Sequence, residues 1–236
     1  MRPNRAGLFV TGTGTGVGKT VVACAIAATL AQRGRLVSVF KPVVTGLAET
    51  AADLADHERL RASARSPQRP ADVAPYRFEP AVSPHLAAEL AGVSIEREAL
   101  RGAAGVAAAA GDVLVAEGVG GLLVPLTGDY LVRDLAVDLG LPVVVAAPPG
   151  LGTISHTLMT IECARAAGLD VRAVVLTPWP RDPGAIHRSN RETLRRLGGV
   201  ELMTMPEIDL RRPAAEPQPQ LPVERWVSPA PLRAAA

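Results

Sequence analysis

The residues between Gly12 and Thr20 have the types and the spacing to hold a polyphosphate. They read Gly-Thr-Gly-Thr-Gly-Val-Gly-Lys-Thr, after a short apolar run and before an Ala-rich stretch with helical spacing. Glycines let backbone N–H groups turn inward around phosphate oxygens, and the start of a helix adds unpaired N–H groups. In the usual P-loop, four residues separate a glycine from the Gly-Lys pair, and this chain has Thr13 in that glycine's place. We therefore interpret the run as a variant P-loop.

Specific roles follow for the side chains and backbone of this loop. Lys19 would reach the β- and γ-phosphates of a nucleoside triphosphate as a catalytic cation, and the Thr20 hydroxyl would bind Mg²⁺. We expect the nucleotide-binding backbone at Gly14, Thr15, Gly16, Val17 and Gly18.

The second lysine of the chain, Lys41, is also a candidate for a chemical role. Among 25 lysines and arginines the chain has only two lysines, Lys19 and Lys41. Lysine is a compact point charge whereas arginine is a rigid fork, so a lysine in so Arg-rich a chain is a candidate for chemistry. Lys41 follows a predicted strand at residues 36–40, and ligands of open parallel sheets bind outside the carboxyl ends of strands. We expect it to stabilise a transferring phosphoryl group; the alternative is a solvated lysine at a strand end.

Two acidic residues are candidate metal ligands. Glu117 follows a predicted strand at residues 113–116 and precedes Gly-Val-Gly-Gly, so its carboxylate is placed to bind Mg²⁺ at the same edge of the sheet. A capping or salt-bridged glutamate is the ordinary alternative. Asp53 is a weaker candidate, because acids are common where helices begin. The four histidines show no ligand spacing, and no Ser-His-Asp or Cys-His pattern indicates covalent catalysis.

Short apolar runs alternate with helical patterns along most of the chain. This alternation implies right-handed βαβ units and a mostly parallel sheet covered by helices on both faces. The predicted fold class is therefore α/β of the P-loop NTPase kind, in one domain over residues 1–210. The expected strands are residues 8–11, 36–40, 113–116, 142–147 and 171–176, and the expected helices are residues 21–32, 53–63, 95–110, 155–167 and 189–197, with a loop at 66–84.

Residues 211–236 differ in composition from this domain. They are rich in Pro, Ala and Gln and have few large apolar side chains, so we expect an irregular tail that buries little and can be removed. Trp226 is the exception, because a lone tryptophan in such a segment often docks on the domain.

The composition excludes several classes of protein. Apolar residues make up 48% of the chain and the net charge is only +2, so a buried core is feasible, and no basic run indicates a nucleic-acid partner. The apolar runs are shorter than the roughly 20 residues that span a bilayer. The first residues lack the pattern of a signal peptide, and two cysteines give no disulfide framework. We therefore expect a cytoplasmic protein with neither a membrane nor a nucleic acid as partner.

Several motifs in this order resemble those of the dethiobiotin synthetase family. Besides the phosphate loop, they are Lys-Pro-Val-Val-Thr-Gly at 41–46, Ser-Pro-His at 83–85, Glu-Gly-Val-Gly-Gly at 117–121 and Leu-Gly-Thr-Ile-Ser-His at 151–156. The resemblance covers about residues 8–197. It implies an ATP- and Mg²⁺-dependent ligase that carboxylates 7,8-diaminopelargonate with CO₂. Ring closure to the ureido product then proceeds through a carbamic–phosphoric anhydride.

The resemblance also implies roles for individual residues. Thr20, Asp53 and Glu117 would hold Mg²⁺, and Lys19 and Lys41 would neutralise the phosphates and the carbamate. It further implies a homodimer in which residues 150–155 and the helix from Ser189 complete the partner's site. The substrate would contact Thr15, Lys41, Thr45, the Gly118 backbone, Ser155 and Asn190; Ser155 and Asn190 stand where family members often have Asn and Tyr.

Recognition of the base departs from the family pattern. Thr177 stands where the family commonly has an asparagine that reads adenine, Pro178 lacks a backbone N–H, and Trp179 could stack on any base. We expect ATP to serve, with other nucleoside triphosphates competing, unless backbone groups near Pro206 read adenine. The leading rival to the biosynthetic interpretation is a partition-type ATPase. Such proteins usually have a further lysine early in the loop, where this chain has Gly14.

Overall fold

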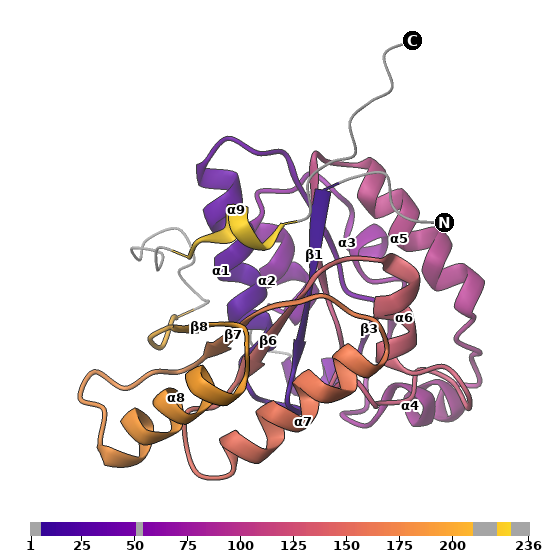
Figure 1. Cartoon of the computed structure of the whole chain (residues 1–236). Coiled ribbons are helices and arrows are strands. Elements are labelled where there is room, and N and C mark those ends of the chain that lie inside the picture. Colours follow the sequence, from indigo (N-terminus) through magenta and orange to yellow (C-terminus); the bar gives the residue numbers. More distant parts are fainter. Residues whose placement is uncertain (1–5, 51–53, 210–220, 228–236) are drawn as a thin grey trace.

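The computed structural model describes residues 6–50, 54–209 and 221–227 of the chain (Figure 1). Its strands are β1 (Ala6–Gly12), β2 (Val37–Phe40), β3 (Val43–Val44), β4 (Tyr76–Arg77), β5 (Val113–Glu117), β6 (Val143–Ala147), β7 (Val171–Leu176) and β8 (Glu201–Thr204). Its helices are α1 (Lys19–Gln32), the 3-10 helix η1 (Leu47–Thr50), α2 (Asp56–Ser63), α3 (Pro70–Val73), α4 (Pro84–Leu90), α5 (Arg97–Ala109), α6 (Val132–Leu139), α7 (Thr153–Ala166), α8 (Ala185–Leu197) and α9 (Val223–Trp226).

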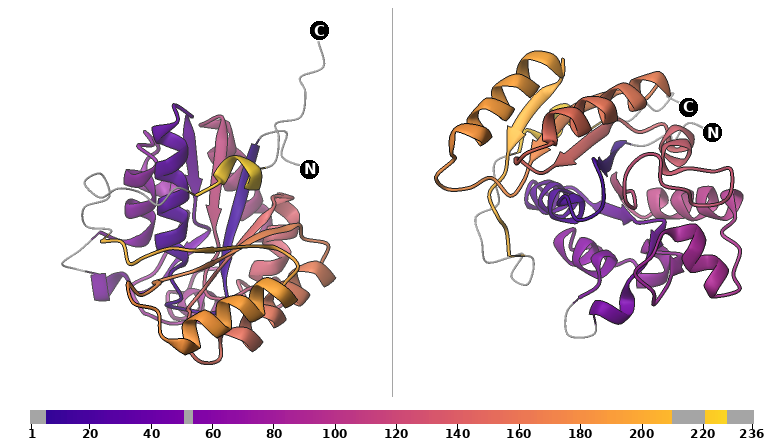
Figure 2. Two further views of the ribbon diagram at one scale, coloured as in Figure 1. Left: turned by 60° about the vertical axis from the view of Figure 1, so that its left-hand side comes forward. Right: turned by 90° about the horizontal axis from the view of Figure 1, so that it is seen from below.

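A parallel sheet runs through the centre of the molecule. In the described part of the chain it has six strands in the order β2-β5-β1-β6-β7-β8, and β3 and β4 form a separate small pair. Side chains of β1, β2, β5 and β6 are buried on both faces, as expected for strands covered by helices on each side. One face packs against α1, α2, α3 and α9, and the other against α5, α6, α7 and α8 (Figure 2).

The α/β class, the parallel sheet and the helices on both faces are confirmed. All five expected strands and all five expected helices are present, and β7 has the predicted bounds. The structure adds β8, a half-buried edge strand of four residues whose sequence has no apolar run. It also adds the short helices α4 and α6, and it places α3 and β4 in the expected loop at 66–84. The helix expected from Asp53 begins three residues later, at Asp56.

Part of the C-terminal tail is docked on the domain. Leu221, Val223 and Trp226 are buried against α1 and the sheet, and the Trp226 side chain is only 1% exposed. The indole Nε1 of Trp226 donates to Glu201 Oε2 of β8 at 2.7 Å, and Arg225 pairs with Glu201 as well. The expectation that the tail buries little is therefore wrong for residues 221–227, because Trp226 has both a hydrophobic slot and a partner for its N–H. The division of the chain at residue 210 stays a prediction.

A chain that ends after Leu210 should be less stable than the full chain. It loses the buried side chains of α9, and loss of a buried tryptophan alone typically lowers stability by about 3–5 kcal/mol. A chain that ends after Val227 keeps α9 and is the matched control. The free energy of unfolding, measured with urea, decides the matter: equal values for the two truncated chains would show that α9 contributes nothing.

Candidate active site at the carboxyl edge of the sheet

The phosphate loop connects β1 to α1 in the conformation that its glycines permit. Gly16 and Gly18 have φ angles of 73° and 90°, in the left-handed region that side chains other than glycine rarely adopt. Gly18 is the N-cap of α1, so the unpaired N–H groups at the start of this helix face the loop. Lys19 folds back across the loop, and its Nζ donates to the Gly14 carbonyl at 2.7 Å. This is the geometry that the glycine spacing predicts for a phosphate cradle.

A cavity of about 700 Å³ opens beside the phosphate loop. Lys19, Thr20, Lys41, Asp56 and Glu117 line its charged side. The remaining wall includes loop residues such as Thr15, together with Leu54, Arg59 and residues within 43–49, 81–84 and 119–124. The cavity is large enough for a small substrate beside a triphosphate.

A network of charges, buried at Lys41 and Glu117 and half-exposed at Asp56, forms the floor of this cavity. Lys41 is 4% exposed, and its Nζ lies 2.6 Å from Asp56 Oδ2, 2.7 Å from Glu117 Oε1 and 3.4 Å from Thr20 Oγ1. The Thr20 hydroxyl in turn donates to Glu117 Oε1 at 2.7 Å. The ammonium of Lys41 thus contacts all three of these oxygen groups. The structure contradicts the alternative of a solvated lysine at a strand end.

Sheet register brings these groups together. Phe40, the last residue of β2, pairs with Ala116 of β5. The residues that follow them, Lys41 and Glu117, therefore lie side by side at the carboxyl edge of the sheet. Glu117 itself pairs with Val10 of β1, two residues before the phosphate loop begins at Gly12. The close approach of the second lysine to the loop is therefore a consequence of the strand order β2-β5-β1.

Burial and charge set the protonation states in this network. Burial disfavours a charged ammonium, but the Glu117 and Asp56 carboxylates outweigh it and raise the pKa of Lys41. Burial acts against the Asp56 carboxylate too, yet Lys41 and the Thr20 hydroxyl lower the pKa of Asp56. At Lys19, which has no carboxylate in contact among the described residues, burial lowers the pKa. Lys41 is therefore held as a cation and Asp56 as an anion, whereas burial, opposed by Lys41, raises the pKa of Glu117.

The oxygens of this network suit a divalent cation. Mg²⁺ prefers one or two protein carboxylates together with hydroxyl, water and phosphate oxygens. Glu117 is fully buried, and its Oε2 has no hydrogen-bond partner among the described residues. A buried carboxylate oxygen without a partner is unfavourable unless something else binds it. Thr20, Asp56 and Glu117 therefore fit a Mg²⁺ site.

Asp56, which was not among the residues expected at the site, contacts Lys41 at the cavity. Asp53 lies outside the described residues, so its predicted metal role is not tested. Asp56 is the first residue of α2, and an acid in the first turn of a helix is ordinary by itself. Its contact with Lys41 shows its relevance, and the sequence offered no signal for this because the helix was expected to begin three residues earlier.

The residues expected to read the base lie at the ends of β7 and β8. Thr177 is buried beside the phosphate loop: a Cβ built on Gly18 would lie 2.7 Å from the Thr177 methyl group. Pro206 follows β8 and is exposed. Trp179 has other contacts, since its ring meets His187 edge-on and lies 5.6 Å from the Arg191 guanidinium, both on α8.

The residues expected to contact the substrate divide into two groups. Thr15, Lys41 and Thr45 line the cavity. Gly118 is buried and is not among the residues that line the cavity.

Ser155 and Asn190 lie apart from the cavity, on α7 and α8. The Asn190 side-chain amide donates to the carbonyls of Pro149 and Gly150, so both amide hydrogens are used within the chain. The prediction that Ser155 and Asn190 act across a dimer interface stays a prediction.

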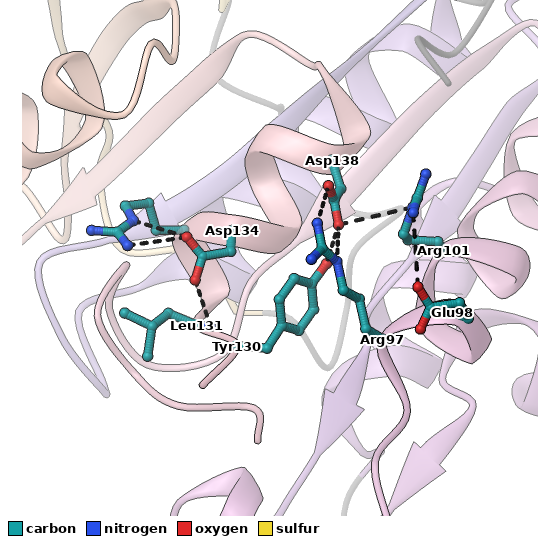
Figure 3. A network of polar contacts seen from close by, with 8 residues as sticks. Arg97, Glu98, Arg101, Tyr130, Leu131, Asp134 and Asp138 are labelled. Carbon is teal, nitrogen blue, oxygen red and sulfur yellow. Dashed lines mark hydrogen bonds and ion pairs between the residues drawn. The ribbon is translucent and has the colours of Figure 1, made fainter. Parts of the chain in front are cut away.

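A polar network that joins α5 and α6 to Tyr130 lies next to the segment that follows Glu117 (Figure 3). The Tyr130 hydroxyl donates to Asp138 Oδ2 at 2.7 Å, and Arg97 of α5 makes two bonds of 2.9 Å to the same carboxylate. Asp134 accepts from the Leu131 backbone N–H at 2.9 Å and so caps α6. These contacts tie residues 122–131, which include the cavity-lining Val124, to two helices.

Comparison with curated proteins identifies the family. The chain is 40% identical to the ATP-dependent dethiobiotin synthetase BioD of Anaeromyxobacter sp. (strain Fw109-5), over 82% of this chain and 90% of that protein. It is 34% identical to the protein of the same name from Bacillus subtilis (strain 168), over 84% and 85%. The chain belongs to the dethiobiotin synthetase family. The resemblance seen in the motifs is thereby confirmed, and a family model described as an AAA domain matches residues 6–210.

Solved structures relate this dethiobiotin synthetase family member to other P-loop proteins by fold. A plasmid partition protein from Borrelia burgdorferi bound to AMPPNP superimposes with a TM-score of 0.56 at 11% identity, over 96% of this chain and 95% of that one. A ParA family ATPase from Chlorobium tepidum gives 0.52 at 12% identity, over 87% and 88%. These likenesses confirm the P-loop fold and give no support to a partition function. In the described part of the chain, no helix is long and apolar enough to cross a membrane.

Replacing Tyr130 by Phe should lower the free energy of unfolding by about 1.5–3 kcal/mol, the usual contribution of a hydrogen bond to a charged group. The ring still fills its buried position, so only the bond to Asp138 is lost. Glu98→Ala is the control, because its contact with Arg101 is a 4.0 Å pair on the surface and should be worth under about 1 kcal/mol. Equal effects of the two substitutions in a urea titration would contradict this role of Tyr130.

Proposed function

We propose that this protein is an ATP-dependent dethiobiotin synthetase. It would combine 7,8-diaminopelargonate, CO₂ and ATP into dethiobiotin, ADP and phosphate. The observation that carries the proposal is the Lys41–Asp56–Glu117–Thr20 network beside the phosphate loop. It is supported by relatives of up to 40% identity that carry this name. We place the enzyme in the cytoplasm, with small molecules as its substrates.

The chemistry needs anionic oxygens to react with one another, and the cavity supplies the opposing charge. An amine of the substrate adds to CO₂ and releases a proton, which gives a carbamate. A carbamate oxygen then attacks the γ-phosphorus, the bond from that phosphorus to the β-phosphate bridge oxygen breaks, and ADP leaves. The second amine attacks the carbonyl carbon of the resulting mixed anhydride, the bond from that carbon to the phosphate oxygen breaks, and the proton lost by the amine leaves with the phosphate as the ring closes. Electrostatic stabilisation of such steps by preorganised cations is typically the largest catalytic contribution.

Each charged residue then has a stated task. Lys19 would neutralise the β- and γ-phosphates from inside the loop, and Lys41 would face the carbamate and the γ-phosphate across the cavity. Thr20, Asp56 and Glu117 would hold Mg²⁺, which offsets phosphate charge when it is bound. Thr15 and Thr45 would position the reacting oxygens from the two sides of the cavity.

We further propose that the enzyme is a homodimer. Large apolar side chains are exposed around α7 and α8, among them Leu151 at 93%, Met159, Ile186 and Leu197. If these side chains form one contiguous patch, a second copy of the chain could cover it. A second copy docked there would bring Ser155 and Asn190 toward the partner's cavity.

A direct assay tests the proposed function. The purified protein is incubated with diaminopelargonate, bicarbonate, Mg²⁺ and ATP, and dethiobiotin is sought by mass spectrometry. Product that depends on every component supports the proposal. ATP hydrolysis that is indifferent to diaminopelargonate would instead support a different P-loop ATPase.

The metal role of Asp56 can be separated from that of Asp53 by paired substitutions. Asp56→Asn removes one of the carboxylates proposed to bind Mg²⁺. It should therefore raise the Mg²⁺ concentration for half-maximal activity by at least about tenfold. Asp53→Asn is the matched control and should change it by less than about twofold. If Asp53→Asn has the larger effect, the assignment based on the sequence motif is right and the present one is wrong.

Relaxed choice of the nucleotide base is the remaining expectation. Thr177 has no amide with which to read adenine, and loss of one such hydrogen bond reduces discrimination by about 1–3 kcal/mol, or roughly ten- to a hundredfold. We expect CTP, GTP or UTP to support catalysis at a kcat/KM within about a hundredfold of that with ATP. A preference for ATP well beyond that over each of the other three would show that backbone groups near Pro206 read the base.

A further inference from the structure

We propose that the Lys41 ammonium and the catalytic Mg²⁺ compete for the same oxygens, so that the metal enters only as Lys41 moves away to an anionic ligand. Lys41 would then act as a built-in counter-ion that suppresses metal binding until a triphosphate is present. This inference rests on the proposed function only in taking Thr20, Asp56 and Glu117 as the metal ligands.

The geometry that points to competition is the set of contacts around one nitrogen. Lys41 Nζ lies 2.6 Å from Asp56 Oδ2 and 2.7 Å from Glu117 Oε1, and the Thr20 hydroxyl is 3.4 Å away. Mg²⁺ binds oxygen at about 2.0–2.1 Å and tolerates little departure from octahedral geometry. A metal held by these same oxygens would stand within a few ångströms of the ammonium. Two cations at that distance repel strongly wherever water cannot screen them.

The charge balance of the network leads to the same conclusion. With both carboxylates ionised, Asp56 and Glu117 carry two negative charges, and Lys41 offsets one of them. Lys41 and Glu117 are buried, and Asp56 is half-exposed. Lys19, also buried, adds a further positive charge nearby. A divalent cation added to this set makes it net positive, which is unfavourable in a low-dielectric region. A triphosphate brings the anions that restore the balance and offers Lys41 a new partner.

Lysine is suited to such an exchange. Its ammonium is a compact charge on a flexible four-carbon stem, so it can leave one pair of oxygens for another while its backbone stays fixed. The Lys41 backbone N–H donates to the Val73 carbonyl at 2.8 Å, which holds the backbone in place. The Lys41 side chain lines the same cavity as the phosphate loop. The free oxygen of the network, Glu117 Oε2, defines the alternative in which the metal binds there and Lys41 stays in place.

Metal binding without nucleotide distinguishes the two arrangements. Mn²⁺, used in place of Mg²⁺, is titrated into each protein and the free ion is measured by electron paramagnetic resonance. Lys41→Met should bind Mn²⁺ at least about tenfold more tightly than the wild type, because the two carboxylates lose their internal counter-ion. Lys19→Met makes the same change of charge without a contact to either carboxylate, and should gain less than about threefold. The double variant Lys41→Met/Glu117→Gln should lose the gain.

A measurement on the unaltered enzyme covers the case in which Lys41→Met does not fold. The chain has only two lysines, so ¹⁵N-labelled lysine gives two side-chain ammonium signals. The Lys41 ammonium signal should differ between the free protein and its complex with AMPPNP and Mg²⁺, because Lys41 leaves Asp56 and Glu117 when the metal is bound. The same Lys41 signal in the free protein and in the metal-saturated AMPPNP complex would overturn the proposal, as would a Lys41→Met variant that folds and binds Mn²⁺ no more tightly than the wild type.

Neither measurement contains diaminopelargonate or bicarbonate, so each reads the metal site whatever the substrate is. If the predicted Mn²⁺ and ammonium results appear but no dethiobiotin forms, the proposed function fails and the competition stands. If dethiobiotin forms but Mn²⁺ affinity is unaffected by loss of Lys41, the competition fails and the proposed function stands.

Discussion

The ammonium of Lys41, enclosed by the carboxylates of Asp56 and Glu117, is the interaction on which the rest of the site depends. Any one of these charges would be strongly unfavourable if buried alone. Together they satisfy one another, and Thr20 joins the network from the first turn of α1. The network therefore fixes the relative positions of the phosphate loop, the end of β2, the start of α2 and the end of β5.

The fold makes this network possible in a simple way. Parallel strands end at one edge of the sheet, and the order β2-β5-β1 sets Lys41, Glu117 and the phosphate loop side by side there. The sheet is buried on both faces by helices rich in alanine, valine and leucine. Outer contacts such as Tyr130 with Asp138, and Trp226 with Glu201, fasten segments that flank the site or extend the sheet. The positions of the charged side chains in the cavity thus depend on the ends of the buried strands, and the flanking segments are fixed by contacts with neighbouring elements.

Much of this could be predicted from the sequence, for identifiable reasons. The glycine spacing around Lys19 and the uninterrupted apolar runs report local structure directly, so the phosphate loop and the inner strands were predicted correctly. The scarcity of lysine singled out Lys41 before any geometry was known. What failed depends on tertiary context. β8 is an edge strand without an apolar run, and α9 is helical and buried because Trp226 packs beside α1. The contact of Asp56 with Lys41 likewise arises only in the folded chain, while the metal role expected of Asp53 stays a prediction.

The competing identity, a partition-type ATPase, shares the architecture of this chain. Sheet order and loop conformation are common property of the fold, and a fold by itself does not determine function. The second lysine between two carboxylates is the feature that suits a reaction of carbamate and phosphate oxygens. Identity of 34–40% with named dethiobiotin synthetases gives the same answer independently.

The part that Lys41 plays in the chemistry is tested most directly by the turnover of a Lys41→Ala variant whose fold is verified by circular dichroism. Loss of one preorganised charge at a reacting group typically lowers the rate by about 10²–10³. We predict a fall of that size in kcat for dethiobiotin formation at saturating ATP and Mg²⁺, with the secondary structure retained. A folded Lys41→Ala variant with near-native kcat would contradict the account.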